Sequence, residues 1–544
     1  MLLYLHFNKY YIMRLSKFLF LALFTFVITN TGSAQFGPLP PFTVQIEPVI
    51  ASPLPALHSF AFAQSGDKWL IIGGRTNGLH GLNSSGGFPP EYKNDLVTVI
   101  DTATWAFYTA DLNQLSQTIA DPMRSANMQY IQEGNYLYMI GGYGYDSVAS
   151  MFVSFPKLTA IHVDNIIDAV INAQPIAPTI RQVTDTNFSI CGGELGKIGS
   201  DYYLIGGHNF GGRYSDDPFA GLFIQTYSDR IKKFNLADDG TTITLSGYSY
   251  QVDTNNFHRR DLNMAPIVNP DNSFGIGIYG GVFRKDSNLP FREPIRLNTA
   301  STSVNTYQQI MNQYTCAMMP IYDSATQKMY TTFFGGISLY NYNDTTGLLT
   351  RDKDVPFVDD ITTLSCSSIG IYEEALLPIE MPSLLGSNAK FVHTQHVSSY
   401  ANEVIRIRDL PNTKILAGYV FGGIRAQEGN FGNSSANDTV YRVFITPNNN
   451  TSIVEELNSI QNTQLFPNPS NQNSTLLFAL KDNSQVSILL FDMTGKKVSE
   501  ITNEEMQKGN QKININTSKL IAGVYVCKIQ CESGERFIKL VIGK

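Results

Sequence analysis

A short apolar run that ends in two glycines recurs along the chain, with 55 to 87 residues between successive pairs. Each run is typical of a buried strand, and glycine can adopt the positive φ or the close backbone approach that a tight strand exit needs. A unit of this size cannot bury its own apolar face alone, so the pattern predicts stacked supersecondary units. The six pairs are Gly73-Gly74, Gly141-Gly142, Gly206-Gly207, Gly280-Gly281, Gly335-Gly336 and Gly422-Gly423.

The first unit shows the expected order of strands most clearly. Residues 69–74 predict one strand, and residues 95–101 alternate as the next. Residues 42–49, ahead of this unit, predict an outer strand for the last unit, which would leave no sheet edge exposed. An insertion at residues 164–172 has helical spacing and predicts a short surface helix in the second unit. Residues 35–446 are therefore expected to form one all-β repeat region.

Both ends of the chain depart from the repeat. Basic residues, an uncharged apolar run and small residues follow one another in residues 1–34, which predicts a signal peptide. Met13 is a natural start, so residues 1–12 would be an over-extended reading frame. The apolar run is too short to cross a hydrocarbon core of ~30 Å, so no membrane span is expected. Residues 447–463 predict a polar linker, and residues 464–544 predict a separate small β domain.

Composition narrows the class of protein. Charged residues make up only 16% of the chain and aromatic residues 12%, which fits many short packed strands better than helical bundles. The net charge of −7 argues against a nucleic-acid partner or binding to an anionic membrane.

Five cysteines in an exported chain cannot all pair with one another. Cys527 and Cys531 lie four residues apart on a predicted strand, about 13 Å from each other, which is beyond disulfide reach. Cys191, Cys316 and Cys366 fall in strand-like segments and are expected to be buried structural thiols.

The C-terminal segment carries several ordered motifs. They are the Phe-Pro-Asn-Pro sequence at 466–469, residues 490–498 around a Thr-Gly-Lys-Lys turn, and residues 520–529. Together they resemble the type A C-terminal sorting domain of type IX secretion substrates in Bacteroidota. The resemblance implies an Ig-like β-sandwich that the type IX machinery recognises, and export through the periplasm to the cell surface or the medium. The motif residues are Pro467, Asn468, Pro469, Gly495, Gly523 and Tyr525.

The repeat region resembles the kelch motif. Asn94, Asp95, Leu96 and Trp105 follow the first glycine pair in the kelch order, with weaker parallels at residues 228–234 and 437–444. The resemblance implies four-stranded propeller blades, and six glycine pairs imply six blades. It also implies that one channel mouth carries the residues after each glycine pair and those that open each innermost strand. The candidate ligand-binding residues are His58, Arg75, Asn77, Arg124, Tyr143, His208, Arg213, His258, Arg259, Arg260, Asp261 and Arg284.

These side chains suit a ligand with carboxylate, phosphate or sugar groups. Alternatively, the arginines brace neighbouring blades through backbone carbonyls and acids such as Asp261. Copper radical oxidase chemistry of the galactose oxidase type is disfavoured, because the chain has no Tyr-His pair. The kelch-fold sialic acid epimerases need a general acid and base, which His258, Asp261 or Glu194 could supply, but nothing selects them. The catalytic residues therefore stay unknown.

No cofactor or metal is expected. The imidazoles of His393 and His396 could converge on a metal ion. However, no further His, Cys or carboxylate lies in close register with them, so the signal is weak. Three functions stay open. The first is a secreted or surface-displayed module that binds a glycan or a protein, the second is a carbohydrate-active epimerase, lyase or hydrolase, and the third is a structural component of the surface layer.

Overall fold

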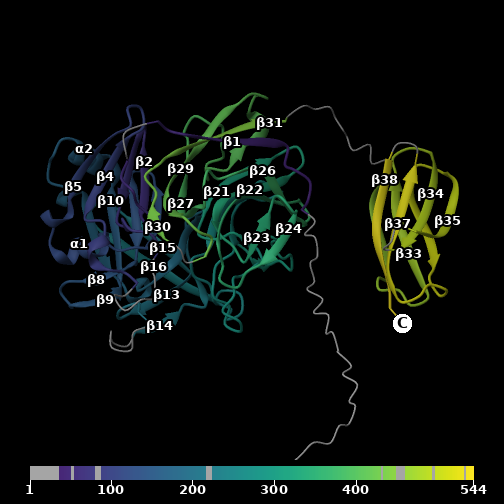
Figure 1. Cartoon of the computed structure of the whole chain (residues 1–544), viewed down its shortest axis with the longest axis horizontal. Coiled ribbons are helices and arrows are strands. Elements are labelled where there is room, and N and C mark those ends of the chain that lie inside the picture. The colour runs from purple at the N-terminus through teal and green to yellow at the C-terminus, as the bar shows by residue number, and fades with distance from the viewer. Residues whose placement is uncertain are drawn as a thin grey trace, which may run out of the picture. The chain divides into compact units, whose positions relative to one another are not determined.

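The structure is a computed structural model (Figure 1), and the chain divides into two compact units, Met1–Pro447 and Asn448–Lys544. The predicted signal peptide, most of the predicted linker and Gly495 lie outside the described residues. Strands dominate both units, so the prediction of an all-β fold is confirmed. The described residues are 36–50, 54–79, 87–215, 223–430, 433–448, 460–492, 496–531 and 534–543.

Six sheets of four or five strands follow one another along the described part of the first unit (Figure 1). The first sheet is β2 (Ala61–Ser65), β3 (Lys68–Ile72), β4 (Leu96–Asp101) and β5 (Ala106–Asp111). The second is β6 (Gln129–Glu133), β7 (Tyr136–Ile140), β10 (Lys157–His162) and β11 (Ile180–Thr184). The third is β12 (Cys191–Ile198), β13 (Asp201–Gly211), β15 (Arg230–Asp238) and β16 (Ile243–Val252), with β14 (Ile224–Tyr227) beside β13.

The remaining three sheets repeat this order. The fourth is β17 (Asn263–Val268), β18 (Phe274–Tyr279), β19 (Ile295–Leu297) and β20 (Thr302–Val304). The fifth is β21 (Ala317–Asp323), β22 (Lys328–Ile337), β25 (Phe357–Cys366) and β26 (Tyr372–Glu380), with β28 (Ile405–Arg406) parallel to β21. The sixth is β27 (Leu385–His393), β29 (Ile415–Ala426), β31 (Tyr441–Pro447) and β1 (Phe42–Pro48), with β30 (Ser434–Ala436) beside β29.

Small elements decorate the sheets. Two hairpins are formed by β8 (Tyr143–Asp146) with β9 (Met151–Ser154) and by β23 (Tyr340–Asn343) with β24 (Leu348–Arg351). The α-helices are α1 (Gln117–Met123) and α2 (Val163–Ile171), and the 3-10 helices are η1 (Pro90–Tyr92), η2 (Leu112–Gln114), η3 (Ala177–Thr179), η4 (Thr186–Phe188) and η5 (Ile407–Asp409). Helix α2 confirms the helix predicted in the second unit, and its apolar residues are buried against the first sheet.

The glycine pairs join each sheet to the next. Both glycines of all six pairs have positive φ. A Cβ at Gly206 would lie 2.6 Å from the carbonyl oxygen of Arg259, in the segment that enters the fourth sheet, and Gly141 faces Ile190 in the same way. Only glycine fits where the backbone of a neighbour comes so close.

The second glycine of a pair donates its amide to the segment that enters the following sheet. Four such hydrogen bonds run from the glycine amide to a carbonyl oxygen: from Gly74 to Ser125 (2.9 Å), from Gly142 to Ile190 (2.8 Å), from Gly207 to Arg259 (2.7 Å) and from Gly423 to Leu57 (3.0 Å). The last of these bonds links the sixth sheet to the segment that enters the first. Aromatic side chains support the same link, because Trp69 of β3 packs on Tyr419 and Phe421 of β29.

Strand β1 completes the sixth sheet from the N-terminal side. It runs antiparallel to β31, with Val44 opposite Ile445, and the two strands lie side by side in Figure 1. Phe42 and Val44 are buried in a cluster with core residues of β21 such as Met319, while Thr43 between them is exposed. This pairing agrees with the outer strand expected at residues 42–49.

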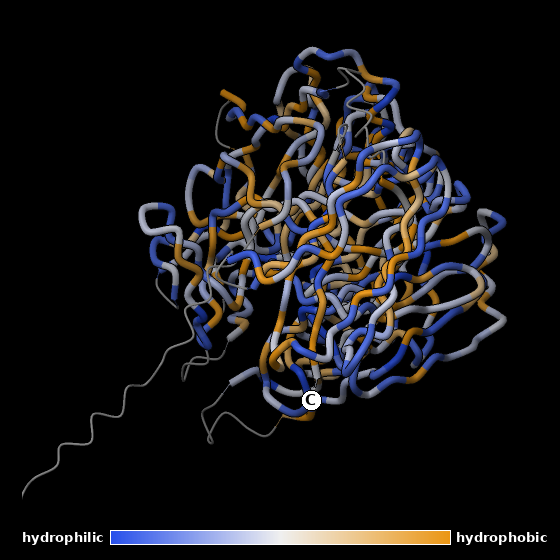
Figure 2. The backbone as a smooth tube through the Cα atoms, turned by 90° about the vertical axis from the view of Figure 1, so that its right-hand side faces the viewer, coloured by the Kyte–Doolittle hydropathy of each residue, from blue (hydrophilic) through white to orange (hydrophobic). Residues whose placement is uncertain are grey.

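The second unit consists of two antiparallel sheets around one core. One sheet is β32 (Ile460–Phe466), β33 (Asn473–Leu480) and β36 (Gly509–Asn516), and the other is β35 (Lys497–Met506), β34 (Ser484–Asp492), β37 (Gly523–Cys531) and β38 (Gly534–Ile542). Buried and less buried residues alternate along β33 and β34, so one face of each of these two sheets packs on the core, and Figure 2 shows hydrophobic and hydrophilic residues mixed along the backbone. Leu476, Ile488 and Ile529 lie at the centre of this core.

The Pro-Asn-Pro motif closes the edge of strand β38. The side-chain amide of Asn468 donates to the carbonyl oxygen of Lys539 (2.7 Å), and its Oδ1 accepts from the Val541 amide (2.8 Å). The side chain thus takes the hydrogen bonds of a neighbouring strand. Tyr525 donates its hydroxyl to the carbonyl oxygen of Ile521 (2.9 Å), which holds the segment before β37.

The cysteines are buried in the cores. Cys191, Cys316, Cys366 and Cys527 are free thiols, and Cys531 is also buried. Burial raises the pKa of the Cys191 thiol to about 12, which makes it a poor nucleophile at neutral pH.

Candidate functional site

A cavity of about 650 Å³ lies among the first strands of the six sheets. We call it the central cavity. Residues of β2, β6, β12, β17, β21 and β27 all line it, together with the turn at residues 401–403. A space of this volume, lined by both polar and apolar side chains, is in the range that proteins use for small ligands.

One end of the central cavity is bordered by equivalent positions of the six sheets. Each of these residues lies just before a first strand or within its first four residues, lines the cavity and has a φ between 50° and 64°. Asn127 donates its amide to the Ser59 carbonyl (3.1 Å), and the amides of the next two positions continue the series at 2.9 and 2.7 Å. The backbone therefore holds these six positions beside the cavity, and five of them carry a short polar side chain. The six residues are Ser59, Asn127, Gly192, Asp261, Thr315 and Asn388.

Charged side chains also line the central cavity. Lys390 of β27 places its Nζ 5.2 Å from the ring centre of Tyr130 on β6, and Glu194 of β12 also lines the cavity. Burial raises the pKa of Glu194, an effect that the Lys390 charge partly offsets. Burial alone would lower the pKa of Lys390, but Tyr130 and Glu194 raise it, so the amine is protonated at neutral pH.

Two of the predicted residues, His258 and Arg260, lie with Asp261 in a cluster that we call the mouth cluster. Its other members are Tyr227, Asp229 and Phe283. His258 contacts the carboxylate of Asp229 through Nδ1 at 2.5 Å, and its ring stacks on Tyr227 at 3.9 Å. The Arg260 guanidinium lies 4.7 Å from the ring centre of Phe283 and 3.4 Å from the Asp261 carboxylate. Asp261 lines the central cavity, so it connects the cavity to the cluster.

His208 belongs to the same region but is covered. Only 5% of the residue is exposed, and its Nδ1 contacts the Gln225 side chain at 2.5 Å. Burial, helped by the charge of Arg260, holds the pKa of His208 well below its usual value, so the ring is neutral. Arg213 follows β13 and is exposed near Tyr143.

Arg75, Arg124 and Tyr143 line a second cavity of about 380 Å³, which is formed by loops, helix α1 and the β8–β9 hairpin. Arg75 donates to the Asn77 side chain (3.1 Å) and to the Pro89 carbonyl (2.8 Å). Arg124 forms ion pairs with Asp95 (2.6 Å) and Asp121 (3.1 Å).

The neighbours of Arg75 and Tyr143 are tightly packed. Burial, and then the Arg75 charge, lower the pKa of His58 to about 3, so that ring is neutral. The Tyr143 hydroxyl donates to the Gly212 carbonyl (2.8 Å) and accepts from the Tyr214 amide (3.2 Å), which joins the second sheet to the loop that carries Arg213.

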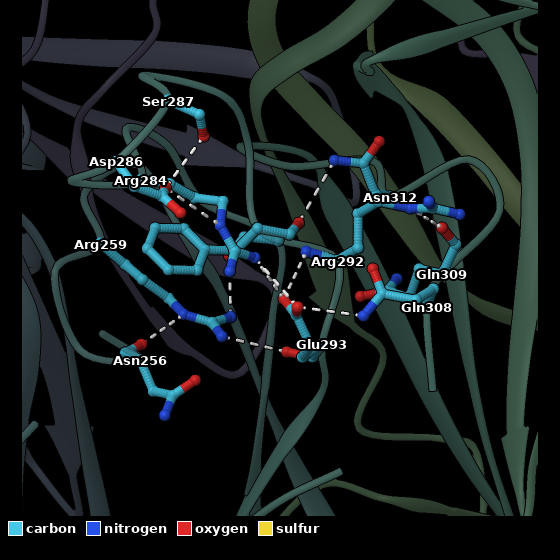
Figure 3. A network of polar contacts seen from close by, with 12 residues as sticks. Asn256, Arg259, Arg284, Asp286, Ser287, Arg292, Glu293, Gln308, Gln309 and Asn312 are labelled. Carbon is cyan, nitrogen blue, oxygen red and sulfur yellow. Dashed lines mark hydrogen bonds and ion pairs between the residues drawn. The ribbon is translucent and has the colours of Figure 1, made fainter. Parts of the chain in front are cut away.

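Arg259 and Arg284 lie in a different network, shown in Figure 3. Arg259 is 1% exposed and donates to the carbonyl oxygens of Asn256 (2.7 Å), Gly280 (3.0 Å) and Glu293 (3.1 Å). The Nη1 of Arg284 donates to both carboxylate oxygens of Glu293, each at 2.9 Å. This geometry corresponds to the bracing alternative, because the donors of Arg259 already have backbone acceptors.

Sequence reasoning did not single out Lys390, Tyr130 or Glu403 in the central cavity. Lys390 lies before an insertion of about twenty residues between β27 and β29, so its distance from the glycine pair differs from that in other sheets. The one sequence feature that could have pointed to Lys390 is that it is a lysine within a strand-like apolar run. Glu194 was named as a possible acid or base, and the structure places it in the cavity.

Within the described ranges, no cluster of three or more His, Cys, Asp or Glu side chains has a geometry suited to a metal ion. His393 lines the central cavity, where burial lowers its pKa to about 4, and His396 lies in the following turn. None of the helices in the described residues has the length and apolar character to cross a bilayer.

The comparisons with known proteins identify the C-terminal unit. Residues 464–543 match the family described as the secretion system C-terminal sorting domain. These residues are a type IX sorting domain. The sorting domain indicates export to the cell surface or secretion, and it implies engagement with the type IX machinery.

Three solved structures match the chain at low identity and with low TM-scores. YjhT matches with 12% identity and a TM-score of 0.41, over 72% of this chain and 99% of YjhT. PorZ of Porphyromonas gingivalis, a surface component of the type IX secretion system, matches with 9% identity and a TM-score of 0.13, over 91% of this chain and 100% of PorZ. A glycoside hydrolase family 43 arabinofuranohydrolase of Bacillus subtilis matches with 9% identity and a TM-score of 0.26, over 90% and 93%. No curated protein matches the sequence.

Proposed function

We propose that the protein is an exported six-bladed kelch-like β-propeller, with an Ig-like sorting domain, that binds a glycan or protein partner. Six sheets in series, joined through their glycine pairs, support the propeller. The bond from Gly423 to Leu57 and the addition of β1 to the sixth sheet support closure of the ring. Two sheets around a single core support the Ig-like sandwich.

The central cavity is the observation that carries the binding function. An exported protein with a cavity of about 650 Å³ meets small solutes and surface polymers directly. The mouth cluster adds aromatic faces and a carboxylate at Asp261, which suit hydroxyl groups or a peptide. The ligand would enter past the five short polar side chains beside the cavity and contact Asp261 first.

A binding screen tests this function. Full-length protein is applied to glycan and protein arrays, beside the variants Asp261→Asn and Asp286→Asn. Capture should fall for Asp261→Asn, because its carboxylate faces the cavity, and persist for Asp286→Asn, whose side chain is 77% exposed at a separate loop. Capture by neither array, or equal capture by both variants, would reject the site.

Export is tested separately. Removal of residues 464–544 should leave the first unit in the periplasm, because the type IX machinery has lost its sorting domain. Cell fractionation and surface labelling measure the distribution against the full-length chain. Normal surface display of the shortened chain would overturn the route.

A carbohydrate-active enzyme is the second candidate. It is favoured by Glu194 and Asp261, two carboxyl groups in the same cavity whose pKa values are raised by burial, as a general acid requires. If the protein turns over a captured glycan and the Glu194→Gln variant does not, the protein is an enzyme. Capture without turnover would select the binding module.

A further inference from the structure

Lys390 brings a positive charge into the central cavity, where Glu194 acts on it electrostatically without forming a close ion pair. Among the described residues, Lys390, Glu194 and Glu403 form no ion pair with one another or with any other side chain. By contrast, Lys197 lines the same cavity and is paired with Glu133 at 2.7 Å. A lysine that faces a cavity unpaired has donors available for a ligand.

The two kinds of charge come from different sheets. Lys390 lies on β27 of the sixth sheet, and Glu194 lies on β12 of the third. Tyr130 of β6 contacts Lys390 across its ring face, at 5.2 Å from Nζ to the ring centre. The cavity therefore offers donors at Lys390 and Tyr130 and acceptors at Glu194.

His393 supplies an independent sign that the cavity is built to bind. The residue is 8% exposed and lines the cavity, and its Nε2 has no hydrogen-bond partner among the described residues. A buried ring nitrogen without a partner is costly unless a ligand or a water satisfies it. His393 lies three positions after Lys390 on β27, so the two side chains leave opposite faces of this strand.

We propose that the central cavity binds a small ligand that carries a carboxylate and, separately, hydroxyl or ammonium donors. The carboxylate contacts Lys390 and the Tyr130 hydroxyl, and the donors contact Glu194. The inference deepens the proposed binding function by naming the class of ligand, and it rests on that function. A charge-assisted bond in a sheltered cavity is stronger than one in bulk water, so the carboxylate should dominate affinity.

The volume of the cavity limits the size of this ligand. About 650 Å³ suits one sugar acid or an amino acid with neighbouring groups, whereas a long polymer could insert only its end. Sugar acids and amino acids share the carboxylate and differ in the donor. The probes in the test separate these two sources.

The test is calorimetry with the full-length protein at pH 7. The probes are glucuronate, glucose and alanine, because glucuronate and glucose differ at C6, a carboxylate against a hydroxymethyl group, and alanine replaces hydroxyl donors with an ammonium. At least one of glucuronate and alanine should bind, and glucose should bind at least tenfold more weakly than the tighter of the two. Binding of glucose as strongly as the tighter carboxylate probe, or no binding of either carboxylate probe, would overturn the proposal.

Three variants assign the contacts. Lys390→Met should weaken binding of the carboxylate probe at least tenfold, and Glu194→Gln should weaken it less. Lys197→Met is the matched control, because this lysine lines the same cavity but is already paired, and it should leave affinity unchanged. Equal loss in Lys390→Met and Lys197→Met would reject the assignment.

A thermal melt of each variant separates misfolding from lost contacts. The protein could instead bind a neutral glycan or a protein on the arrays, and the Lys390→Met variant could bind it equally well. That result would reject the ligand class and still support the binding function.

Discussion

At the scale of single residues, the glycine pairs determine how the first unit is assembled. Gly141 has a φ of 67°, and a Cβ there would collide with the Ile190 carbonyl of the next sheet. The same two demands, a left-handed backbone and close approach, recur at the first glycine of every pair. The repeat seen in the sequence is therefore a repeat of contacts between sheets.

Replacement of Gly141 by alanine should destabilise the first unit more than the matched change at Gly134. Gly134 has a φ of 55° in the β6–β7 turn, and a Cβ there would meet nothing within 4 Å. Gly134→Ala should cost about 1–2 kcal/mol of unfolding free energy from backbone strain. Gly141→Ala adds a collision, for a total of about 2–5 kcal/mol. Urea unfolding measures both, and equal losses would contradict the role of the pairs.

A buried acid gives the first unit a distinctive response to pH. Burial first, and then the negative charges of Asp359, Asp344 and Glu380, raise the pKa of Asp360 from 3.8 to about 7. The folded chain keeps this proton where the unfolded chain loses it. This contribution to stability is complete below about pH 4 and is lost as the pH rises to about 7.

Asp360→Asn should remove this dependence. The variant should match the wild type near pH 4 and become more stable than it by up to about 4 kcal/mol at pH 8. Denaturant unfolding of both proteins from pH 4 to pH 8 measures the difference. A difference that stays constant over this range would show that Asp360 does not hold the proton.

At the scale of elements, a strand from the N-terminal end completes the last sheet. Strand β1 pairs with β31 and buries Phe42 and Val44, while Thr43 faces solvent. Because side chains alternate across a strand, adjacent positions test opposite faces of the same element. The element thus ties together two parts of the chain almost 400 residues apart.

Val44→Lys should destabilise the first unit strongly, since it places an unpaired charge in the core beside Met319. The expected loss is about 3 kcal/mol or more, whereas Thr43→Lys should stay within about 0.5 kcal/mol of the wild type. Thermal unfolding and proteolysis near the N-terminal end report the effect. Similar stability of the two variants would argue that β1 is not part of the folded core.

The sequence predicted the elements better than the contacts of the site. The glycine runs, the outer strand and the helix over 164–172 follow from local periodicity, and the structure has each of them. The contacts of Arg259 could not be predicted from sequence, because its three carbonyl acceptors come from residues 256, 280 and 293. Lys390 and Glu194 share a cavity only through the arrangement of the third and sixth sheets.

At the scale of the whole molecule, the two units have separate tasks. The sorting domain at 464–543 accounts for export, and the first unit carries the cavities and the clusters of polar residues. The proposed propeller explains why ligand contacts come from distant parts of the chain. The central cavity exists only if all six first strands are held around it, which requires the sixth sheet to stay on the first.

Hydrogen exchange at the Gly423 amide tests this closure most directly. This amide donates to the Leu57 carbonyl at 3.0 Å, as the Gly142 amide donates to Ile190 between the second and third sheets. Closure predicts that both amides exchange slowly and to a similar degree in the native protein. Rapid exchange at Gly423 beside a protected Gly142 would contradict a closed ring of six sheets.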